Sequence, residues 1–216
     1  MIAFFDVDET LISIKSMFSF LEFHLRWRGE PPGAYERIAA SLRAAAARGV
    51  PRAEVNRSYY RFLAGESALR LSDSGRYWFD AQDDRLFNPR TVEALRRHRA
   101  AGDRIVLLSG SFFPCLDPIA AAVGADWTLG TRPLLRYGRL TGEVLVPMIG
   151  AAKGRAARAA TVVTGVPRAA CAAYGDHVSD LPLLEAVGRP VVVGADPVLT
   201  AHARRHGWTL LESAAA

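Results

Sequence analysis

Two aspartates near the start of the chain are the residues whose types and spacing best suit chemistry. Asp6 and Asp8 follow the apolar residues 2–5, a run that predicts a buried strand. Because side chains alternate along a strand, we expect both carboxylates to leave its end in the same direction. Two close carboxylates repel each other unless a cation or a proton is shared between them. The pair therefore predicts a metal site, and it offers a carboxylate nucleophile of the kind that forms an aspartyl-phosphate.

A second and a third segment carry residues suited to phosphate. An apolar run ends in Ser109, Gly110 and Ser111, where a hydroxyl can donate to a phosphate oxygen and glycine lets backbone amides approach. Lys153 lies at the head of a predicted helix, and a lysine ammonium is a point charge suited to phosphate. These segments weigh against the alternative that Asp6 and Asp8 form an ordinary Asp-rich turn after a strand.

A fourth segment completes a series of motifs. Another apolar stretch ends in Gly175 and Asp176, with Asp180 one helical turn later. Together the four segments, which span about residues 4–180, resemble the haloacid dehalogenase superfamily of phosphatases, subclass IB, the group that includes phosphoserine phosphatases. The first motif matches as Asp-x-Asp-x-Thr and the fourth as Gly-Asp-x-x-x-Asp. The matching residues are Asp6, Asp8, Thr10, Ser109, Lys153, Gly175, Asp176 and Asp180.

The resemblance implies a role for each acidic residue. Asp6 is expected to attack phosphorus and to coordinate Mg²⁺, and Asp8 to act as general acid and base, with its backbone carbonyl as a further metal ligand. Asp176 is expected to be the third protein contact to Mg²⁺, which prefers oxygen ligands. Asp180 is expected to hold the site or Lys153 in place without contacting the metal. The alternative is that Asp180 is simply an acidic residue at a helix N-terminus. Thr10 either orients the first loop or simply caps a helix.

The remaining motif residues are expected to bind the transferring phosphoryl group. Ser109 and the amide of Gly110 or Ser111 would hold its oxygens, and Lys153 would neutralise its charge. Lys15 lies about where phosphoserine phosphatases carry a glutamate that binds the substrate ammonium group. A lysine there would favour an anion, so we expect a substrate other than phosphoserine; the alternative is that Lys15 extends into solvent.

The whole chain sets further limits. It has 216 residues, half of them hydrophobic, which suits one core domain with a modest insertion. We expect no membrane span and no signal peptide, and with only Cys115 and Cys171 present we expect a reduced, cytoplasmic protein. The formal net charge is +5. We interpret the scattered arginines as residues on solvated helix faces, and we expect no nucleic-acid partner.

The order of elements predicts an α/β fold with a Rossmann-like, mainly parallel sheet and helices on both faces. After the first strand, breaks at Gly, Pro and Gly-Pro clusters predict four helices between residues 16 and 82. These would form a small helical cap of the C1 type over residues 15–83, with the catalytic core in 1–14 and 84–216. Helix and strand then alternate, with a hairpin in 134–144 and a helix over 178–187.

The leading hypothesis is a Mg²⁺-dependent phosphomonoesterase that acts on a small phosphorylated metabolite. One alternative is a phosphotransferase that passes the same phosphoryl group to an alcohol. Another is a non-catalytic binding protein that keeps the fold, although the presence of every motif residue weighs against it. A nucleic-acid binder is suggested only by the charge, and a salt-dependent affinity for DNA or RNA would support it.

Overall fold

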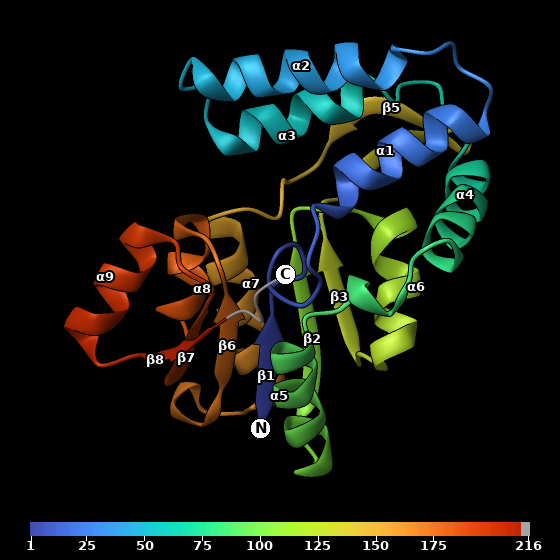
Figure 1. The fold of residues 1–216 in the computed structure, drawn as a ribbon. Coiled ribbons are helices and arrows are strands. Elements are labelled where there is room, and N and C mark those ends of the chain that lie inside the picture. Colours follow the sequence, from blue (N-terminus) through green and yellow to red (C-terminus); the bar gives the residue numbers. More distant parts are fainter. Residues whose placement is uncertain (213–216) are drawn as a thin grey trace.

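The centre of the molecule is a sheet of six parallel strands in the order β3-β2-β1-β6-β7-β8. The computed structural model describes residues 1–212 (Figure 1). This parallel sheet, with helices around it, confirms the expected fold class. Their bounds are β1 (Ile2–Phe5), β2 (Arg104–Ser109), β3 (Trp127–Gly130), β6 (Ala172–Gly175), β7 (Arg189–Val193) and β8 (Thr209–Leu211).

Helices cover both faces of this sheet because its strands are apolar on both sides. In β1, Ala3 and Phe5 point to one face and Ile2 and Phe4 to the other, and each pair belongs to a separate apolar core. The first core includes side chains of α5 and α6, and the second includes those of α7, α8 and α9. The bounds are α5 (Pro89–Ala100), α6 (Phe113–Val123), α7 (Ala151–Thr164), α8 (Leu181–Leu184) and α9 (Pro197–His206).

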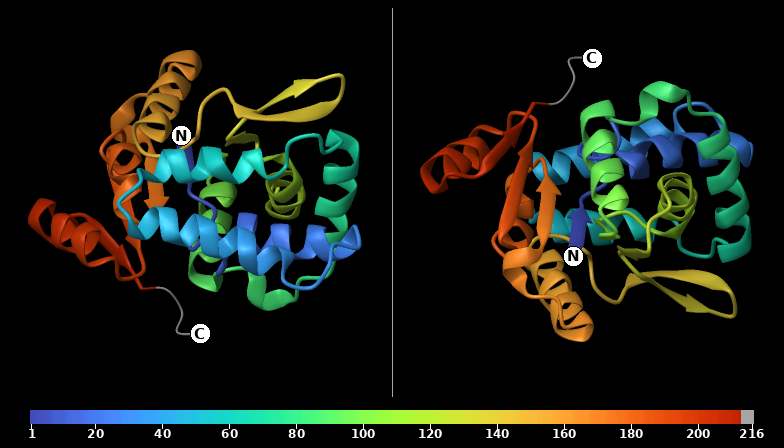
Figure 2. Two further views of the ribbon diagram at one scale, coloured as in Figure 1. Left: turned by 90° about the horizontal axis from the view of Figure 1, so that it is seen from above. Right: turned by 90° about the horizontal axis from the view of Figure 1, so that it is seen from below.

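Four helices inserted between β1 and α5 lie over the carboxyl ends of the strands (Figures 1 and 2). The first two end where the sequence predicts a break, at Gly29 and Gly49, each with a φ of +80° that glycine adopts at little cost. In α4, Ser67 caps the start by accepting a hydrogen bond from the amide of Arg70. The bounds are α1 (Ser16–Trp27), α2 (Ala34–Ala47), α3 (Arg52–Arg61) and α4 (Ala68–Asp80).

The predicted hairpin is present, and it packs on the inserted helices although it follows β3 in the sequence. It consists of β4 (Pro133–Arg136) and β5 (Arg139–Val144), joined at Tyr137 and Gly138, whose φ values of 50° and 73° suit a tight two-residue turn. The amide of Gly65 donates to the carbonyl of Leu140 at 2.8 Å, and the amide of Ala68 donates to the carbonyl of Gly138 at 2.9 Å.

The predicted helix over 178–187 is wrong in its extent. The chain instead forms a short 3₁₀ segment, η3 (Val178–Asp180), followed by the single-turn α8. Pro182 explains the difference, since it has no N–H for a helical bond to residue 178 and its ring would clash with that carbonyl. Proline is tolerated in the first turn, so the α-helix begins at Leu181. Two further 3₁₀ turns of the same length are η1 (Asp84–Leu86) and η2 (Arg168–Ala170).

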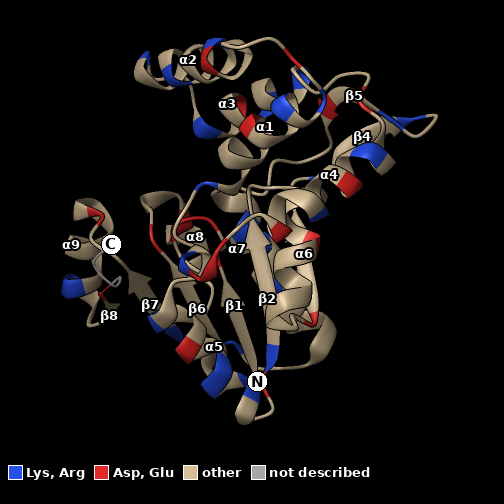
Figure 3. Cartoon of the chain, turned by 45° about the vertical axis from the view of Figure 1, so that its right-hand side comes forward, with Lys and Arg blue, Asp and Glu red and all other residues tan. Residues whose placement is uncertain are grey.

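Two whole-molecule features bear on the partners expected from the sequence. Among residues 1–212, no helix combines the length and the apolar character that crossing a bilayer requires. In the view of Figure 3, Lys and Arg lie on several separate elements and are interspersed with Asp and Glu.

Candidate active site

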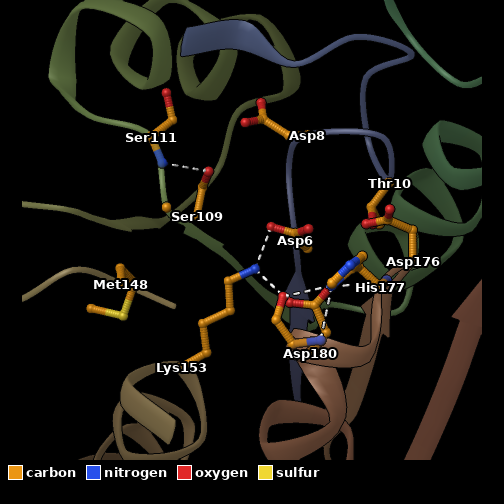
Figure 4. A network of polar contacts seen from close by, with 12 residues as sticks. Asp6, Asp8, Thr10, Ser109, Ser111, Met148, Lys153, Asp176, His177 and Asp180 are labelled. Carbon is orange, nitrogen blue, oxygen red and sulfur yellow. Dashed lines mark hydrogen bonds and ion pairs between the residues drawn. The ribbon is translucent and has the colours of Figure 1, made fainter. Parts of the chain in front are cut away.

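The predicted site residues come from segments that end at one edge of the sheet. Phe5 of β1 pairs with Leu107 of β2 on one side and with Tyr174 of β6 on the other. The residues that follow these strands therefore emerge side by side, and the amide of Asp6 donates to the carbonyl of Tyr174 at 3.0 Å. Figure 4 shows the result, in which side chains from the first, second and fourth motifs surround the Lys153 ammonium group.

Lys153 is the centre of this network. It lies in the first turn of α7 and is 4% exposed, and its Nζ donates to Oδ1 of Asp6 and to Oδ1 of Asp180, both at 2.6 Å. Burial alone would lower the pKa of this ammonium group, but the charges of Asp180 and Asp6 outweigh burial and raise it. Lys153 is therefore held charged between two carboxylates.

A close approach of two helices makes this contact possible. Gly154 follows Lys153 in α7, and a Cβ atom there would lie 2.4 Å from the carbonyl oxygen of Pro182 in α8. The absence of a side chain at Gly154 lets α7 approach the start of α8. This approach places Asp180, which directly precedes α8, within reach of Lys153.

Three acidic side chains gather beside the lysine. Asp6, Asp176 and Asp180 each offer an oxygen, and these oxygens lie within 4.8 Å of one another. Burial and the neighbouring Asp180 raise the pKa of Asp176 to about 6. The same two causes raise the pKa of Asp6 well above its usual range, against the opposing effect of Lys153. The cluster is thus short of positive charge even with Lys153 in place.

The donor set of this cluster fits a hard cation such as Mg²⁺. Asp6 accepts from Lys153 through Oδ1, and Asp176 accepts from the hydroxyl of Thr10 through Oδ1 at 2.8 Å. Within residues 1–212 the second carboxylate oxygen of each accepts no hydrogen bond from an amide, a hydroxyl or an ammonium group. Asp180 differs, since its Oδ1 accepts from Lys153 and its Oδ2 from the amide of His177 at 3.3 Å.

Asp8 lies apart from the acidic cluster, toward the inserted helices (Figure 4). Its Oδ1 accepts a hydrogen bond of 3.0 Å from the amide of Ser16, the first residue of α1. Burial raises the pKa of Asp8, and the hydrogen bonds from Ser16 oppose this shift. The neighbouring Glu9 takes a φ of 60°, a conformation that non-glycine residues rarely adopt, in the turn that separates Asp8 from Thr10.

The loop after β2 is held from two sides. The carbonyl of Gly110 accepts a hydrogen bond from Nδ2 of Asn56 on α3 at 2.9 Å and another from the hydroxyl of Thr131 at 2.8 Å. The Ser109 hydroxyl accepts from the amide of Ser111 at 3.0 Å. The Ser111 hydroxyl is fully buried and accepts from that of Ser16 at 2.8 Å, so it faces α1.

A cavity of about 130 Å³ lies between this sheet edge and the inserted helices. Its lining includes six of the predicted site residues, and the other lining residues come from α1, α2, α3, η3 and the loop before α7. These six residues are Asp6, Asp8, Lys15, Ser109, Gly110 and Lys153. The other lining residues are Met17, Phe18, Leu42, Arg52, Val55, Asn56, Tyr59, Ile149 and Ser179.

Four predicted residues lie beside the cavity rather than in its lining, within the described part of the chain. Thr10 and Asp180 hold Asp176 and Lys153 respectively, and Ser111 faces α1. Asp176 contacts Thr10 and belongs to the acidic cluster next to Asp6. His177 caps η3 by accepting from the amide of Ser179 at 3.0 Å, which is a local structural contact.

Sequence reasoning missed the contribution of α3 to the site. Arg52 and Asn56 are one helical turn apart and both line the cavity. Each also contacts a motif loop, since Arg52 donates to the hydroxyl of Ser179 at 3.3 Å and Asn56 donates to Gly110. Their spacing of four residues is the only signal in the sequence, and it shows that they share a helix face without showing what that face contacts.

A larger surface hollow of about 910 Å³ lies along β6, β7 and β8, away from this site. Its lining includes His98, Arg168, Arg189, His202 and Trp208. None of the predicted site residues lines it, so its size is unrelated to the chemistry described above.

Known proteins and protein families resemble this chain in sequence. The model of a family described as haloacid dehalogenase-like hydrolase matches residues 3–185. A probable phosphatase of Mycobacterium tuberculosis is 37% identical over 120 residues, which cover 56% of this chain and 42% of that protein. The chain thus spans less than half the length of that curated relative.

Solved structures share the whole fold. A Bordetella pertussis protein of unknown function has a TM-score of 0.87 and 27% identity, with 97% of each chain covered. A substrate-bound phosphoserine phosphatase has a TM-score of 0.72 and 18% identity, with 97% of this chain and 91% of that chain covered. At this identity the second likeness shows a common fold.

Proposed function

The chain belongs to the haloacid dehalogenase-like hydrolase family, and we propose that it is a Mg²⁺-dependent phosphomonoesterase that hydrolyses a small phosphorylated metabolite through an aspartyl-phosphate. The observation that carries this proposal is the position of Asp6 in the lining of the cavity, paired with Lys153 and adjacent to Asp176. The relative named as a probable phosphatase supports the same activity.

The metal would be held by the carboxylates of Asp6 and Asp176 and by the backbone carbonyl of Asp8. When bound, Mg²⁺ supplies positive charge that offsets the charge of the acidic cluster and of the phosphoryl group. Asp180 takes a supporting role in this proposal, because both of its oxygens already accept hydrogen bonds from Lys153 and His177.

In the first step, a carboxylate oxygen of Asp6 attacks phosphorus, and the bond from phosphorus to the ester oxygen breaks. Asp8 donates its proton to the leaving oxygen, a task for which a raised pKa is suited. Lys153, the Ser109 hydroxyl and backbone amides of its loop hold the phosphoryl oxygens while charge develops on them.

In the second step, Asp8 takes a proton from a water molecule that attacks phosphorus. The bond between phosphorus and the Asp6 oxygen breaks, which releases inorganic phosphate and restores both carboxyl groups to their starting states. The four inserted helices, residues 15–83, would act as a cap over the core formed by 1–14 and 84–216, and would limit the access of water between the steps.

We also propose that the protein works in the reducing cytoplasm. Cys115 and Cys171 are both free and buried, which suits a compartment where thiols stay reduced.

The first test of the proposed activity replaces the nucleophile. We expect Asp6→Asn to lower kcat on p-nitrophenyl phosphate by at least about a thousandfold, because an amide cannot form the phosphoryl intermediate. Asp80→Asn, which changes an exposed aspartate at the end of α4, is the matched control and should keep the wild-type rate. An Asp6→Asn protein that folds normally and turns over like the wild type would remove Asp6 from the mechanism.

A second measurement separates hydrolysis from phosphoryl transfer. With glycerol added as an acceptor, the proposal expects one inorganic phosphate for each p-nitrophenol released. A large yield of glycerol phosphate in place of inorganic phosphate would instead identify a phosphotransferase that uses the same intermediate.

A further inference from the structure

The cavity above Asp6 has an apolar upper wall. Phe18 of α1, Leu42 of α2 and Val55 of α3 line it from the inserted helices, and Ile149 closes it from the loop before α7. Such side chains offer no hydrogen bonds to a sugar or another many-hydroxyl group. The part of a substrate that lies between the phosphoryl group and the cavity mouth is therefore expected to be a short carbon skeleton.

The cavity lining has no carboxylate to spare for a positively charged substrate group. Within residues 1–212, the carboxylates that line the cavity are Asp6 and Asp8, and both are committed to the phosphoryl chemistry. An ammonium group on a substrate would thus find no spare counter-charge in the lining. It would also lie near Arg52 and Lys15, which would repel it.

Two exposed cations in the lining, Arg52 and Lys15, are available to a ligand. Arg52 donates only to a neutral hydroxyl, that of Ser179 at 3.3 Å, and takes part in no ion pair within the described residues. Lys15 pairs with Glu9 at 3.4 Å, but both side chains are about half exposed, so the pair is weak and easily exchanged.

We infer that the substrate of this site is an acidic phosphomonoester, whose leaving group carries a second anionic group on a short carbon skeleton and no ammonium group. Arg52 binds the second anion and Lys15 assists it at the mouth of the cavity. A carboxylate is the group best matched to a guanidinium fork. This inference rests on the proposed function for its phosphoryl end, and it adds the class of the leaving group.

The test uses three probes with the same two-carbon skeleton and different ends. They are phosphoglycolate with a carboxylate, ethyl phosphate with a methyl group and phosphoethanolamine with an ammonium group. Binding to the Asp6→Asn protein is measured by calorimetry with Mg²⁺ present, so that turnover plays no part. We expect phosphoglycolate to bind at least about tenfold more tightly than ethyl phosphate, and phosphoethanolamine to bind more weakly than either.

Variants then assign the preference to named side chains. Arg52→Met in the same background should remove most of the advantage of phosphoglycolate, and Lys15→Met should remove a smaller part. Arg48→Met is the matched control, because Arg48 is exposed at the end of α2 and does not line the cavity. Thermal unfolding of each variant checks that the fold is intact.

Two results would overturn the inference. One is equal or tighter binding of phosphoethanolamine, and the other is an Arg52→Met protein that keeps the full preference for phosphoglycolate. The outcome for the proposed function is separate. If the wild-type protein hydrolyses no phosphomonoester but phosphoglycolate still binds most tightly, the proposed activity fails and the inference about the charge of the ligand stands. If the protein hydrolyses phosphoethanolamine fastest, the inference about the charge of the leaving group fails and the proposed phosphatase activity stands.

Discussion

At the scale of single residues, the site depends on one buried lysine that is shared between two buried carboxylates. Lys153 bridges Asp6 and Asp180 from a position that solvent barely reaches. Isolated carboxylates are costly to bury, so the ammonium group stabilises the folded state, and in the proposed mechanism the same group binds the phosphoryl oxygens. We therefore expect stability and activity to fall together when this residue is changed.

Replacing Lys153 tests that coupling. In Lys153→Met, the free energy of unfolding measured with urea and EDTA should fall by about 3–5 kcal/mol at pH 8, because an uncompensated charge remains buried. The carboxylates can escape this cost by protonation, which the raised pKa of Asp6 already favours. The deficit should therefore shrink as the pH falls from 8 to 5. A deficit that is absent, or that grows toward pH 5, would contradict this account.

At the scale of secondary-structure elements, α3 connects the inserted helices to two of the motif loops. Arg52 and Asn56 contact the loops of the fourth and second motifs respectively, from one face of the helix. Asn56 is also buried against Met17, with its Nδ2 3.5 Å from the sulfur atom. The position of α3 and the position of the Gly110 carbonyl are therefore linked through a single amide group.

Removing that amide should loosen the loop without unfolding the protein. We expect Asn56→Ala to reduce kcat/KM on p-nitrophenyl phosphate by about five- to tenfold and stability by about 1–2 kcal/mol, the range for a buried hydrogen bond. Ser58→Ala is the control, since the Ser58 hydroxyl donates within α3 to the Glu54 carbonyl. Steady-state kinetics with both proteins would refute the link if the two variants behaved alike.

The hairpin illustrates what the sequence shows and what it conceals at this scale. The turn at Tyr137 and Gly138 could be predicted from local residue types. Its packing against α3 and α4 could not, because the bonds from Gly65 and Ala68 join segments about seventy residues apart. For the same reason the sequence placed Arg52 and Asn56 on a helix but gave no sign of the loops that they reach.

At the scale of the whole molecule, the sheet explains why so much of the site could be predicted. Asp6, Ser109 and Asp176 each follow a buried run, and parallel strands end at a common edge. Their meeting there therefore follows from the pattern of apolar residues alone. The contacts of Lys153 depend in addition on the tight approach of α7 and α8 at Gly154 and Pro182, which no local pattern specifies.

A buried histidine ties global stability to pH. His24 of α1 is 1% exposed, and its Nδ1 lies 2.9 Å from the Ser74 hydroxyl of α4. Burial, with the charges of Arg28 and Arg70, lowers its pKa to about 4, although the carboxylate of Glu66 lies 3.5 Å from its Nε2 and favours the charged form. Between about pH 6.5 and pH 4 the unfolded chain binds a proton at this residue that the folded chain does not, so the contribution to stability is lost as the pH falls through this window.

This dependence can be measured against a variant that does not titrate. The free energy of unfolding of the wild type should fall more steeply from pH 6.5 to pH 4 than that of His24→Asn, which keeps a polar side chain near Ser74. Urea unfolding at half-unit pH steps gives both curves. Parallel curves across this window would show that His24 does not titrate as proposed.

The most direct test of the central claim is to trap the phosphoryl group on Asp6. An Asp8→Asn protein mixed with p-nitrophenyl phosphate and Mg²⁺ should form the intermediate, since this leaving group needs little protonation, and should hydrolyse it slowly without its base. Acid quenching, reduction with borohydride and peptide mass spectrometry should then find homoserine at position 6. Turnover with an unmodified Asp6, or with the modification at another carboxylate, would contradict the account.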